Sequence, residues 1–291
     1  MPPSASIVIP AHNEASVISQ CLSAFADAAH DEWQVVVVCN GCSDNTADVA
    51  RRTLPTATVI ELPVPSKAAA LNAGDAAATV FPRIYLDADI QVSLDALRAT
   101  ARTLQDAEER GVALAVAPRP RFETSQSPAF VRAFYRAWQR SDFLGDGVIG
   151  NGLYALNAIG RGRFGAFPDL FGDDFLVYSL FGANERFTLQ DHHFLIHSPR
   201  NFQGLLNVRT RVYYGNAQFL HGTTGVTKAD NSAASARSLL KRSRSPRTFI
   251  DAVVYLGVNA LAKARAVARS KRNGTVKWDR DATSRARSIS S

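Results

Sequence analysis

Cysteine is scarce in this 291-residue chain, which contains only Cys21, Cys39 and Cys42. Three cysteines are too few for a disulfide scaffold, and so low a number is typical of a reducing compartment. Cys39 and Cys42 have the spacing of a redox pair or of half a zinc site. Because no second pair follows, we interpret them as small residues that flank a loop.

The chain also lacks the glycine motifs of two large nucleotide-binding classes. The turn after the first predicted strand, Ala11-His-Asn-Glu14, contains no glycine, which argues against a Rossmann dinucleotide site with its Gly-x-Gly-x-x-Gly turn. A Gly-x-x-x-x-Gly-Lys-Ser/Thr phosphate loop is absent as well. The first residues show no basic-then-apolar leader, so we expect no cleaved signal peptide.

The composition is that of a folded globular protein, with 46% apolar and 20% charged residues. Positive charge is concentrated at the C-terminal end, where residues 226–291 hold 15 Lys or Arg against four Asp, a net charge of +11. Because the whole chain has a net charge of +7, residues 1–225 sum to −4. The basic character therefore belongs to the C-terminal part of the chain.

Short apolar runs alternate with helix-like segments, the order typical of an α/β fold. The predicted strands are 6–10, 34–39, 58–61, 84–86, 112–117 and 153–156, and Pro118-Arg-Pro-Arg121 is expected to break regular structure. The predicted helix caps are Ser43 or Asp44, Ser66 and Ser93. The loops after the first strands are polar and rich in Asn, Asp or Gly, the pattern of a nucleotide-binding half-sheet.

Two carboxylates, Asp87 and Asp89, follow the buried strand over 84–86. Burial of an unpaired carboxylate is costly, so this pair requires a cation or hydrogen-bond donors. Carboxylate oxygens are hard ligands that suit Mg²⁺ or Mn²⁺. A helix cap is the alternative, but Ser93 is the better cap, which leaves both carboxylates without that duty.

A second acidic pair, Asp173 and Asp174, precedes an apolar helical run over 175–181. Acids in a first helical turn interact well with the helix dipole and need no function. A carboxylate at a helix start that faces a pocket is also well placed to act as a general base. Both interpretations remain open at this point.

Three further segments contain candidate ligand residues. The glycines of 145–152 indicate backbone close to a ligand, or a plain hairpin loop. His192, His193 and His197 invite a zinc interpretation, but the first two point to opposite faces of a strand, so ordinary polar histidines are favoured. Arg209 and Arg211, on a helix predicted over 202–219, either hold a diphosphate or cover the helix surface.

The C-terminal tail is interpreted as a basic linker over 223–247 followed by a mostly apolar run over 249–262 with Lys and Arg on both sides. This run is too short to cross a bilayer, which takes about 20 apolar residues. We favour an interfacial helix on an anionic membrane surface. A helix docked on the rest of the chain or on a partner is the alternative, and nucleic acid is not expected, because no aromatic-lined groove accompanies the charge.

These segments together resemble the family 2 glycosyltransferases, inverting enzymes of the GT-A fold. Residues 6–14 are similar to that family's opening strand and turn, residues 40–46 to its second nucleotide loop, and residues 66–74 to its Gly-Lys-x-x-Ala-Leu-Asn-x-Gly segment. Asp87-Ala-Asp89 is similar to its metal motif, and Gly172-Asp-Asp-Phe-Leu176 to the segment with an acidic pair whose second member is the base. In this order and spacing the motifs cover most of residues 6–216.

The resemblance implies a mixed, mostly parallel sheet flanked by helices. The charge and apolar pattern predict a basic helical tail over 223–291. Ahead of that tail, the resemblance implies a Rossmann-like nucleotide-sugar half over 1–118 and an acceptor half over 119–222. It also implies Asp174 as the catalytic base, and Asp87 and Asp89 as ligands of Mn²⁺ or Mg²⁺. The implied donor-binding residues are Pro10, Ala11, Asn13, Glu14, Asn40, Asp44, Lys67, Asp87, Arg209 and Arg211.

Three positions depart from the family pattern. Asn40 stands where an Asp commonly contacts the base or ribose, and Asp173 replaces the usual Glu. Arg209-Thr-Arg211-Val-Tyr213 matches only loosely the Gln-x-x-Arg-Trp of processive polymerases, and the sequence lacks the spanning helices of those enzymes. Addition of a single sugar is therefore expected rather than polymer synthesis.

The expected function is metal-dependent, inverting transfer of one sugar from a nucleoside diphosphate sugar, with UDP favoured, to an acceptor hydroxyl in envelope glycan or glycolipid synthesis. The expected location is cytoplasmic and peripheral on the inner face of the membrane. A nucleotidyltransferase is disfavoured because no glycine-rich, basic first loop is present. A non-catalytic nucleotide-sugar sensor or membrane scaffold is the alternative from another class, and the presence of Asp87, Asp89 and Asp174 together argues against it.

Overall fold

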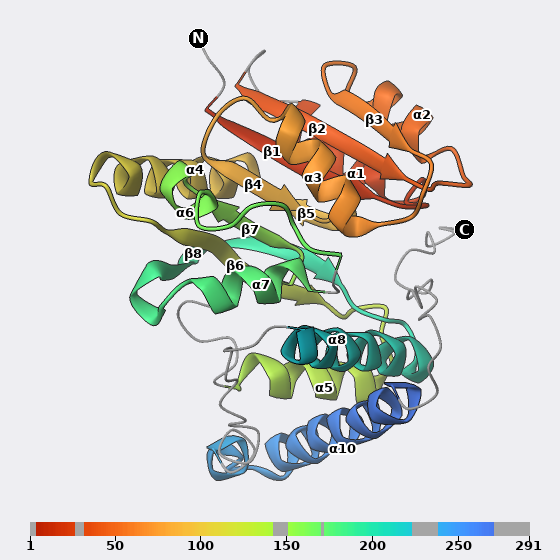
Figure 1. Cartoon of the computed structure of the whole chain (residues 1–291). Coiled ribbons are helices and arrows are strands. Elements are labelled where there is room, and N and C mark those ends of the chain that lie inside the picture. The colour runs from red at the N-terminus through yellow and green to blue at the C-terminus, as the bar shows by residue number, and fades with distance from the viewer. Residues whose placement is uncertain (1–3, 27–31, 142–150, 170–171, 223–237, 271–291) are drawn as a thin grey trace. The chain divides into compact units, whose positions relative to one another are not determined.

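The computed structural model describes the chain except for residues 1–3, 27–31, 142–150, 170–171, 223–237 and 271–291 (Figure 1). The chain forms two compact units. The first comprises Met1–Arg121, Asp146–Asp169 and Asp173–Ile196, and the second Phe122–Gly145, Leu170–Gly172 and His197–Ser291. The domain boundaries predicted at residues 118 and 222 come from composition and motifs. The two units are defined by contacts in space, so each contains segments that are distant in sequence.

An eight-stranded sheet has the order β3-β2-β1-β4-β7-β6-β8-β5. Its strands are β1 (Ala5–Ala11), β2 (Trp33–Asn40), β3 (Thr58–Leu62), β4 (Arg83–Leu86), β5 (Ile90–Val92), β6 (Ala115–Glu123), β7 (Leu153–Leu156) and β8 (Arg186–His197). The first four strands in this order are parallel, while β4 with β7, β6 with β7, and β5 with β8 are antiparallel. The predicted mixed sheet flanked by helices is thus confirmed.

The helices of the first unit are α1 (Ile18–Ala26), α2 (Thr46–Thr53), α3 (Lys67–Ala77), α4 (Leu94–Glu109), α6 (Ala158–Arg161) and α7 (Asp173–Leu180), with a short 3₁₀ turn, η2 (Ala183–Glu185). The caps predicted at Ser66 and Ser93 are confirmed, because their hydroxyls accept hydrogen bonds from Ala69 N and Ala96 N. The predicted cap of α2 was wrong. Asn45 occupies that position without a side-chain bond, and Asp44 Oδ1 instead accepts from Thr46 N in a tighter local turn.

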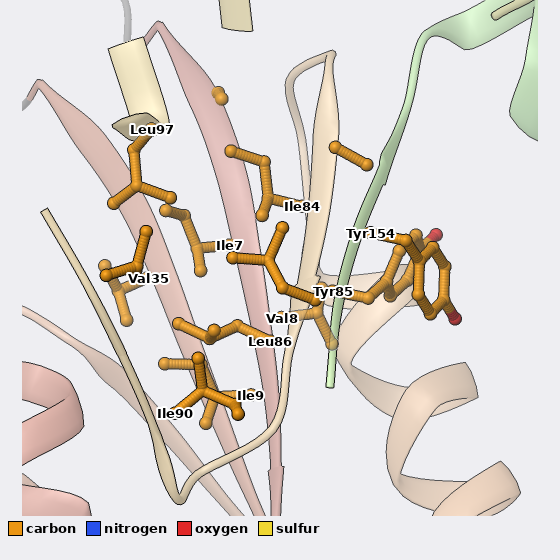
Figure 2. Packing of buried hydrophobic residues seen from close by; sticks show 14 of the residues in the cluster. Ile7, Val8, Ile9, Val35, Ile84, Tyr85, Leu86, Ile90, Leu97 and Tyr154 are labelled. Atoms are coloured by element: carbon orange, nitrogen blue, oxygen red, sulfur yellow. The ribbon is translucent and has the colours of Figure 1, made fainter. Parts of the chain in front are cut away.

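The core of the first unit lies on both faces of the parallel strands, as expected for strands with helices on each side. All seven residues of β1 are buried. On one face, Ile7, Ile9, Val35 and Leu97 pack together (Figure 2). On the other face, Val36 and Val38 pack against α3, where Gly74 lies directly over Val8.

The prediction that residues 118–121 break regular structure was wrong, because β6 continues through both prolines to Glu123. Pro118 and Pro120 are two residues apart, so their missing N–H groups fall on the same edge of the strand. The pairing of β6 with β7 covers only Ala115 and Val116, and thus ends before the first proline. Proline lacks the backbone N–H that would donate a hydrogen bond to a neighbouring strand. Because the pairing with β7 does not use residues 118 and 120, β6 tolerates proline at both.

The second unit is built on three helices, α5 (Ala129–Gln139), α8 (Phe202–Gly222) and α10 (Pro246–Ser270), and α10 packs against both of the others (Figure 1). α10 is longer than the predicted 249–262, and one of its faces is docked, as in the alternative considered for the tail. In the described part of the chain, no helix is both long and apolar enough to cross a membrane.

The packing of α3 on the sheet makes Gly74 a sensitive position. A Cβ atom there would collide with the Val8 side chain and lie 3.2 Å from Val38 Cγ2, whereas a Cβ at Gly257 in α10 would meet no atom within 4 Å. Alanine favours a helix over glycine by about 1 kcal/mol, and overpacking costs about 1–3 kcal/mol. We expect Gly74→Ala to lower the urea midpoint of unfolding. The matched control Gly257→Ala should leave it unchanged or raise it, and equal effects of the two substitutions would contradict this packing.

Candidate active site

Lys67 joins acidic residues from two segments of the first unit. Its Nζ lies 2.8 Å from Asp87 Oδ1 and 2.9 Å from Asp173 Oδ1. Lys67 is the first residue of α3, Asp87 follows β4, and Asp173 begins α7. Burial alone would lower the pKa of Lys67, but the two carboxylates outweigh it and raise the pKa above its usual value. The ammonium group is therefore a fixed positive charge between two carboxylates.

Asp173 has a second partner, because Tyr154 OH on β7 donates a hydrogen bond to Asp173 Oδ2 at 3.0 Å. The side chain of Asp173 is only 11% exposed, so both of its oxygens are held in a largely buried place. A hydrogen bond to a charged group contributes about 1.5–3 kcal/mol. Asp173 is thereby fixed by its neighbours, whereas no Lys or Arg among the described residues forms an ion pair with the adjacent Asp174.

Asp174 has the electrostatics of a general base. Burial and the negative charges of Asp173 and Asp87 raise its pKa to about 6, while Lys67 opposes the shift. Its Oδ1 accepts a hydrogen bond from Phe175 N at 2.8 Å. A carboxylate with a pKa close to neutrality accepts a proton more readily than an ordinary one and is still ionised at pH 7.

The two carboxylates after β4 lie beside α1. The pKa of the Cys21 thiol on α1 is raised, first by burial and then by the negative charges of Asp89, Asp87 and Glu14. These three carboxylates therefore lie near one buried side chain. Gly152 approaches Asp87 from the other side, since Gly152 O accepts from Asp87 N at 2.8 Å. A Cβ at Gly152 would lie 3.3 Å from Asp87 Oδ2 and 2.9 Å from Ile90, and its φ of +100° favours glycine. Gly152 thus permits the close approach of β7 to the acidic loop.

The loops after β1 and β2 are joined by side chains that the sequence assigns to donor binding. Asn13, at φ +52°, accepts a hydrogen bond from Ser43 N at 2.7 Å through its Oδ1. Asp44 Oδ2 accepts from Ala15 N at 3.2 Å.

Pro10 and Ala11 are buried at the end of β1, and Glu14 is buried at the start of the next turn. These residues surround the carboxyl ends of β1 and β2, and their contacts with a donor remain a prediction.

Asn40 connects three segments. Its Nδ2 donates to Ala11 O at 2.8 Å, and its Oδ1 accepts from Ser66 N at 3.1 Å. The side chain is therefore used to fix the end of β1 and the start of α3, and Asn40 is only 5% exposed. An aspartate would lack the amide donor that reaches Ala11 O. This internal role is a physical reason for asparagine at a position where the family commonly has Asp.

The two arginines assigned to donor binding lie on α8 in the second unit. Arg209 is buried, its Nε donates to Asn259 Oδ1 on α10 at 3.0 Å, and its guanidinium lies 5.0 Å from the centre of the Trp138 ring. The structure thus gives Arg209 a packing role among α5, α8 and α10. Arg211 is partly exposed. A contact of either arginine with a diphosphate remains a prediction.

A layer of residues that sequence reasoning missed supports the acidic cluster. Tyr85 stacks on Tyr154 with ring centres 4.9 Å apart (Figure 2). Tyr85 OH donates to Asp75, which also pairs with Arg83 at 2.6 Å and Arg161 at 2.8 Å. Burial alone would raise the pKa of Asp75, but these hydrogen bonds outweigh it and hold the pKa below its usual value. The sequence shows a tyrosine in each of the predicted strands that became β4 and β7. It does not show that the two tyrosines pair, or which acids they contact.

The predicted histidines lie away from this site, and of the predicted glycine segment only Gly152 is seen at it, beside Asp87. His192 Nε2 lies 3.2 Å from Asp95 Oδ2 on the surface. Within the described ranges, no three His, Cys, Asp or Glu side chains form a group that could hold a metal ion. Of the predicted glycine segment, residues 145–150 lie outside the described residues.

The donor set nevertheless suits one kind of divalent cation. Mg²⁺ and Mn²⁺ at phosphate sites take hard oxygen ligands, and Mg²⁺ is usually held by only one or two carboxylates together with substrate phosphates. Asp87 and Asp89 supply such carboxylates, and the Lys67 ammonium already shows that Asp87 is placed to bind a cation. These residues therefore fit a cation that arrives with a diphosphate, and they do not fit a closed all-protein cage.

Comparison with known proteins decides the family. The model of Glycosyl transferase family 2 matches residues 6–151, half of the chain. The chain belongs to glycosyl transferase family 2. The match begins in β1 and covers the loops after β1, β2 and β4, Lys67 and both carboxylates after β4. The resemblance stated from the motifs is thus confirmed. None of the curated proteins matches the chain.

Solved structures extend the likeness over most of the chain. A mannosyltransferase from Pyrobaculum calidifontis, PcManGT, in complex with GDP-Man and Mn²⁺, has a TM-score of 0.58 and 21% identity over 95% of this chain and 77% of its own. S. aureus TarS 1–349 in complex with UDP-GlcNAc has a TM-score of 0.51 and 13% identity over 96% of this chain and 94% of its own. These similarities show the shared GT-A fold. Together with the family match, they make this family 2 protein a glycosyltransferase.

Removal of the Lys67 ammonium should increase the affinity of this family 2 glycosyltransferase for divalent cations. In Lys67→Met the carboxylates of Asp87 and Asp173 lose their shared positive charge, so we expect Mn²⁺ to bind about tenfold more tightly without nucleotide, a change of about 1.4 kcal/mol. Electron paramagnetic resonance of free Mn²⁺ measures this directly. Lys67→Arg, which keeps the charge, is the control, and unchanged Mn²⁺ binding in Lys67→Met would show that the ammonium does not compete with a cation.

Proposed function

We propose that the protein transfers one sugar from a nucleoside diphosphate sugar to an acceptor hydroxyl, with inversion at the anomeric carbon. The observation that carries the proposal is the position of Asp174. Asp174 has a raised pKa and follows Asp173, which is paired with the ammonium group of Lys67. Both lie in the unit whose parallel strands carry the family's nucleotide loops. In open sheets of this kind, ligands bind at the carboxyl ends of parallel strands.

Each residue of the site has a defined part in the proposed reaction. Asp174 takes the proton of the acceptor hydroxyl as that oxygen forms a bond to the anomeric carbon, and the bond between this carbon and the diphosphate oxygen breaks. Lys67 and Tyr154 hold Asp173 in place, so the negative charge of Asp173 keeps the pKa of Asp174 raised. Pro10, Ala11, Asn13, Glu14 and Asp44 border the place of the nucleoside.

Asp87 and Asp89 would hold Mn²⁺ or Mg²⁺ together with the diphosphate. A bound divalent cation supplies charge neutralisation for the leaving diphosphate. The structure of PcManGT with GDP-Man and Mn²⁺ supports this part of the proposal. Lys67 lies beside the same carboxylate and is placed to turn from Asp87 to a phosphate oxygen when the donor enters.

The proposed donor is a UDP sugar, as in the TarS structure, which contains UDP-GlcNAc. PcManGT contains GDP-Man, so this fold accommodates two nucleobases. The acceptor proposal is an envelope glycan or a lipid-linked sugar, with the protein at the inner face of the membrane. It is supported by the concentration of 15 cations in residues 226–291. A non-catalytic sensor would need no general base such as Asp174 beside the ion pair of Lys67 and Asp173.

The substitution Asp174→Asn removes the proton acceptor while leaving the volume of the side chain nearly unchanged. Turnover, measured as release of nucleoside diphosphate, should fall by roughly 10²–10⁴-fold. Thermal-shift titration with UDP, GDP, dTDP and CDP, each with and without Mn²⁺, should show the same stabilisation as in the wild type. Asp106→Asn, an exposed change of the same charge on α4, is the control. Loss of nucleotide binding together with turnover would instead give Asp174 a role in the donor site.

Turnover should also depend on pH. Asp174 must be ionised to accept a proton, and its pKa is raised to about 6. Turnover should therefore fall about tenfold per pH unit below pH 6 and level off above it. The measurement is kcat from pH 4.5 to 8 with saturating donor. A profile whose acid limb lies near pH 4 would mean that the group responsible is an ordinary carboxylate.

A further inference from the structure

The helix α10 has a docked face whose orientation is fixed by buried polar contacts. Asp251, 1% exposed, accepts hydrogen bonds from Arg136 at 2.6 and 3.1 Å and from Arg140 at 3.1 Å, both on α5. Asn259 Oδ1 accepts from Arg209 at 3.0 Å and from Tyr213 at 3.2 Å, both on α8. Two anchors eight residues apart on one side of the helix determine which side chains point away from α5 and α8.

The side of α10 that points away from those helices is apolar. Its large side chains are about half exposed, at 53% for Phe249, 59% for Ile250, 51% for Val253, 48% for Leu261 and 51% for Val267. We call these five residues the outer face. Small exposed residues, Gly257, Ala260 and Ala264, lie between them. Soluble monomers rarely expose a continuous apolar strip of this kind without a partner for it.

Cations lie at the two ends of this strip, Arg247 before it and Lys263 and Arg265 near its C-terminal end. At about 100° of rotation per residue, the outer face and the small residues between its members fall within about 120° of the helix surface. Lys263 follows about 40° beyond one edge, and Arg247 and Arg265 about 40° beyond the other. Asp251 is the only acid among residues 246–270, and it is buried against α5. The outer face therefore combines an apolar centre with positive charge at both ends.

We propose that the outer face of α10 lies flat in the interfacial region of an anionic membrane, while the opposite face stays docked on α5 and α8. Apolar side chains on one side and Lys or Arg at its borders are the pattern of a helix that binds in the plane of such a surface. A second copy of this chain fits less well. A symmetric contact between two outer faces would bring Arg247, Arg265 and Lys263 of both copies together with no acid to balance them.

This inference rests on the proposed function only for its purpose, which is to bring the enzyme to an acceptor held in a membrane. Binding to lipid itself requires neither donor nor turnover. Only the outward half of α10 is available to the lipid, so the proposal combines the interfacial helix predicted from the sequence with the docked helix that was its alternative. The docked half is engaged in hydrogen bonds and ion pairs within the second unit.

Flotation of the full-length protein with lipid vesicles tests the proposal. We expect binding to phosphatidylcholine vesicles that contain roughly a third phosphatidylglycerol, and little binding to phosphatidylcholine alone. The double substitution Val253→Gln and Leu261→Gln should lower the partition coefficient about tenfold or more. The matched control replaces two exposed valines of the first unit, Val64→Gln and Val112→Gln, which are 64% and 44% exposed, and should change nothing. Arg247→Gln with Lys263→Gln should weaken binding to anionic vesicles and reduce its sensitivity to salt.

Several outcomes would overturn the proposal. One is a wild type that stays unbound to anionic vesicles, and another is equal binding by the outer-face variant. A third is a dimer that sedimentation shows for the wild type and not for Val253→Gln with Leu261→Gln, since this would assign the outer face to a second copy. Thermal-shift titration with nucleotides separates this test from the function. The outer-face variant should retain its nucleotide response, and Asp174→Asn should retain its vesicle binding.

Discussion

The ammonium group of Lys67 is the contact on which the rest of the site depends. It lies within 3 Å of carboxylates from two segments that are 86 residues apart in sequence, Asp87 and Asp173. Carboxylates brought this close repel one another and resist burial unless a cation or donors compensate. The ammonium group lies between Asp87 and Asp173 and offsets the repulsion between their carboxylates, while the charge of Asp173 raises the pKa of the neighbouring Asp174. The same set of charges therefore stabilises the buried carboxylates and raises the pKa of the proposed base.

The sheet makes this arrangement possible. Parallel pairing of β1 with β2 and β4 brings their carboxyl ends to one edge, and antiparallel pairing of β4 with β7 brings Tyr154 beside Tyr85. Behind the tyrosines, Asp75 is held by Arg83 and Arg161. The acidic cluster therefore rests on a second set of paired charges in the interior, and the two sets are connected through stacked rings.

Much of the fold follows from local sequence signals, and much of the site does not. Apolar runs and caps such as Ser66 and Ser93 predict β1 to β4, α3 and α4, because short-range forces decide them. The strand through Pro118 and Pro120 could not be predicted, because tolerance of proline depends on which edge of β6 is paired. Asp87, Asp89 and Asp174 are visible as motifs. The partners of Tyr154 and Asp75, and the docked face of α10, arise from contacts between distant segments, for which a single sequence contains no local signal.

Asn40 has a consequence for engineering the donor preference of this enzyme. A designer who wished to change nucleobase selectivity would turn first to this residue, since the family commonly has an aspartate there. Its amide, however, ties Ala11 O to Ser66 N and so sets the spacing between the first strand and the helix that carries Lys67. A substitution at Asn40 would displace the ammonium group along with any base contact. Libraries for new donors are better built on exposed positions of the neighbouring loop, such as Ser43, while Asn40 is kept constant.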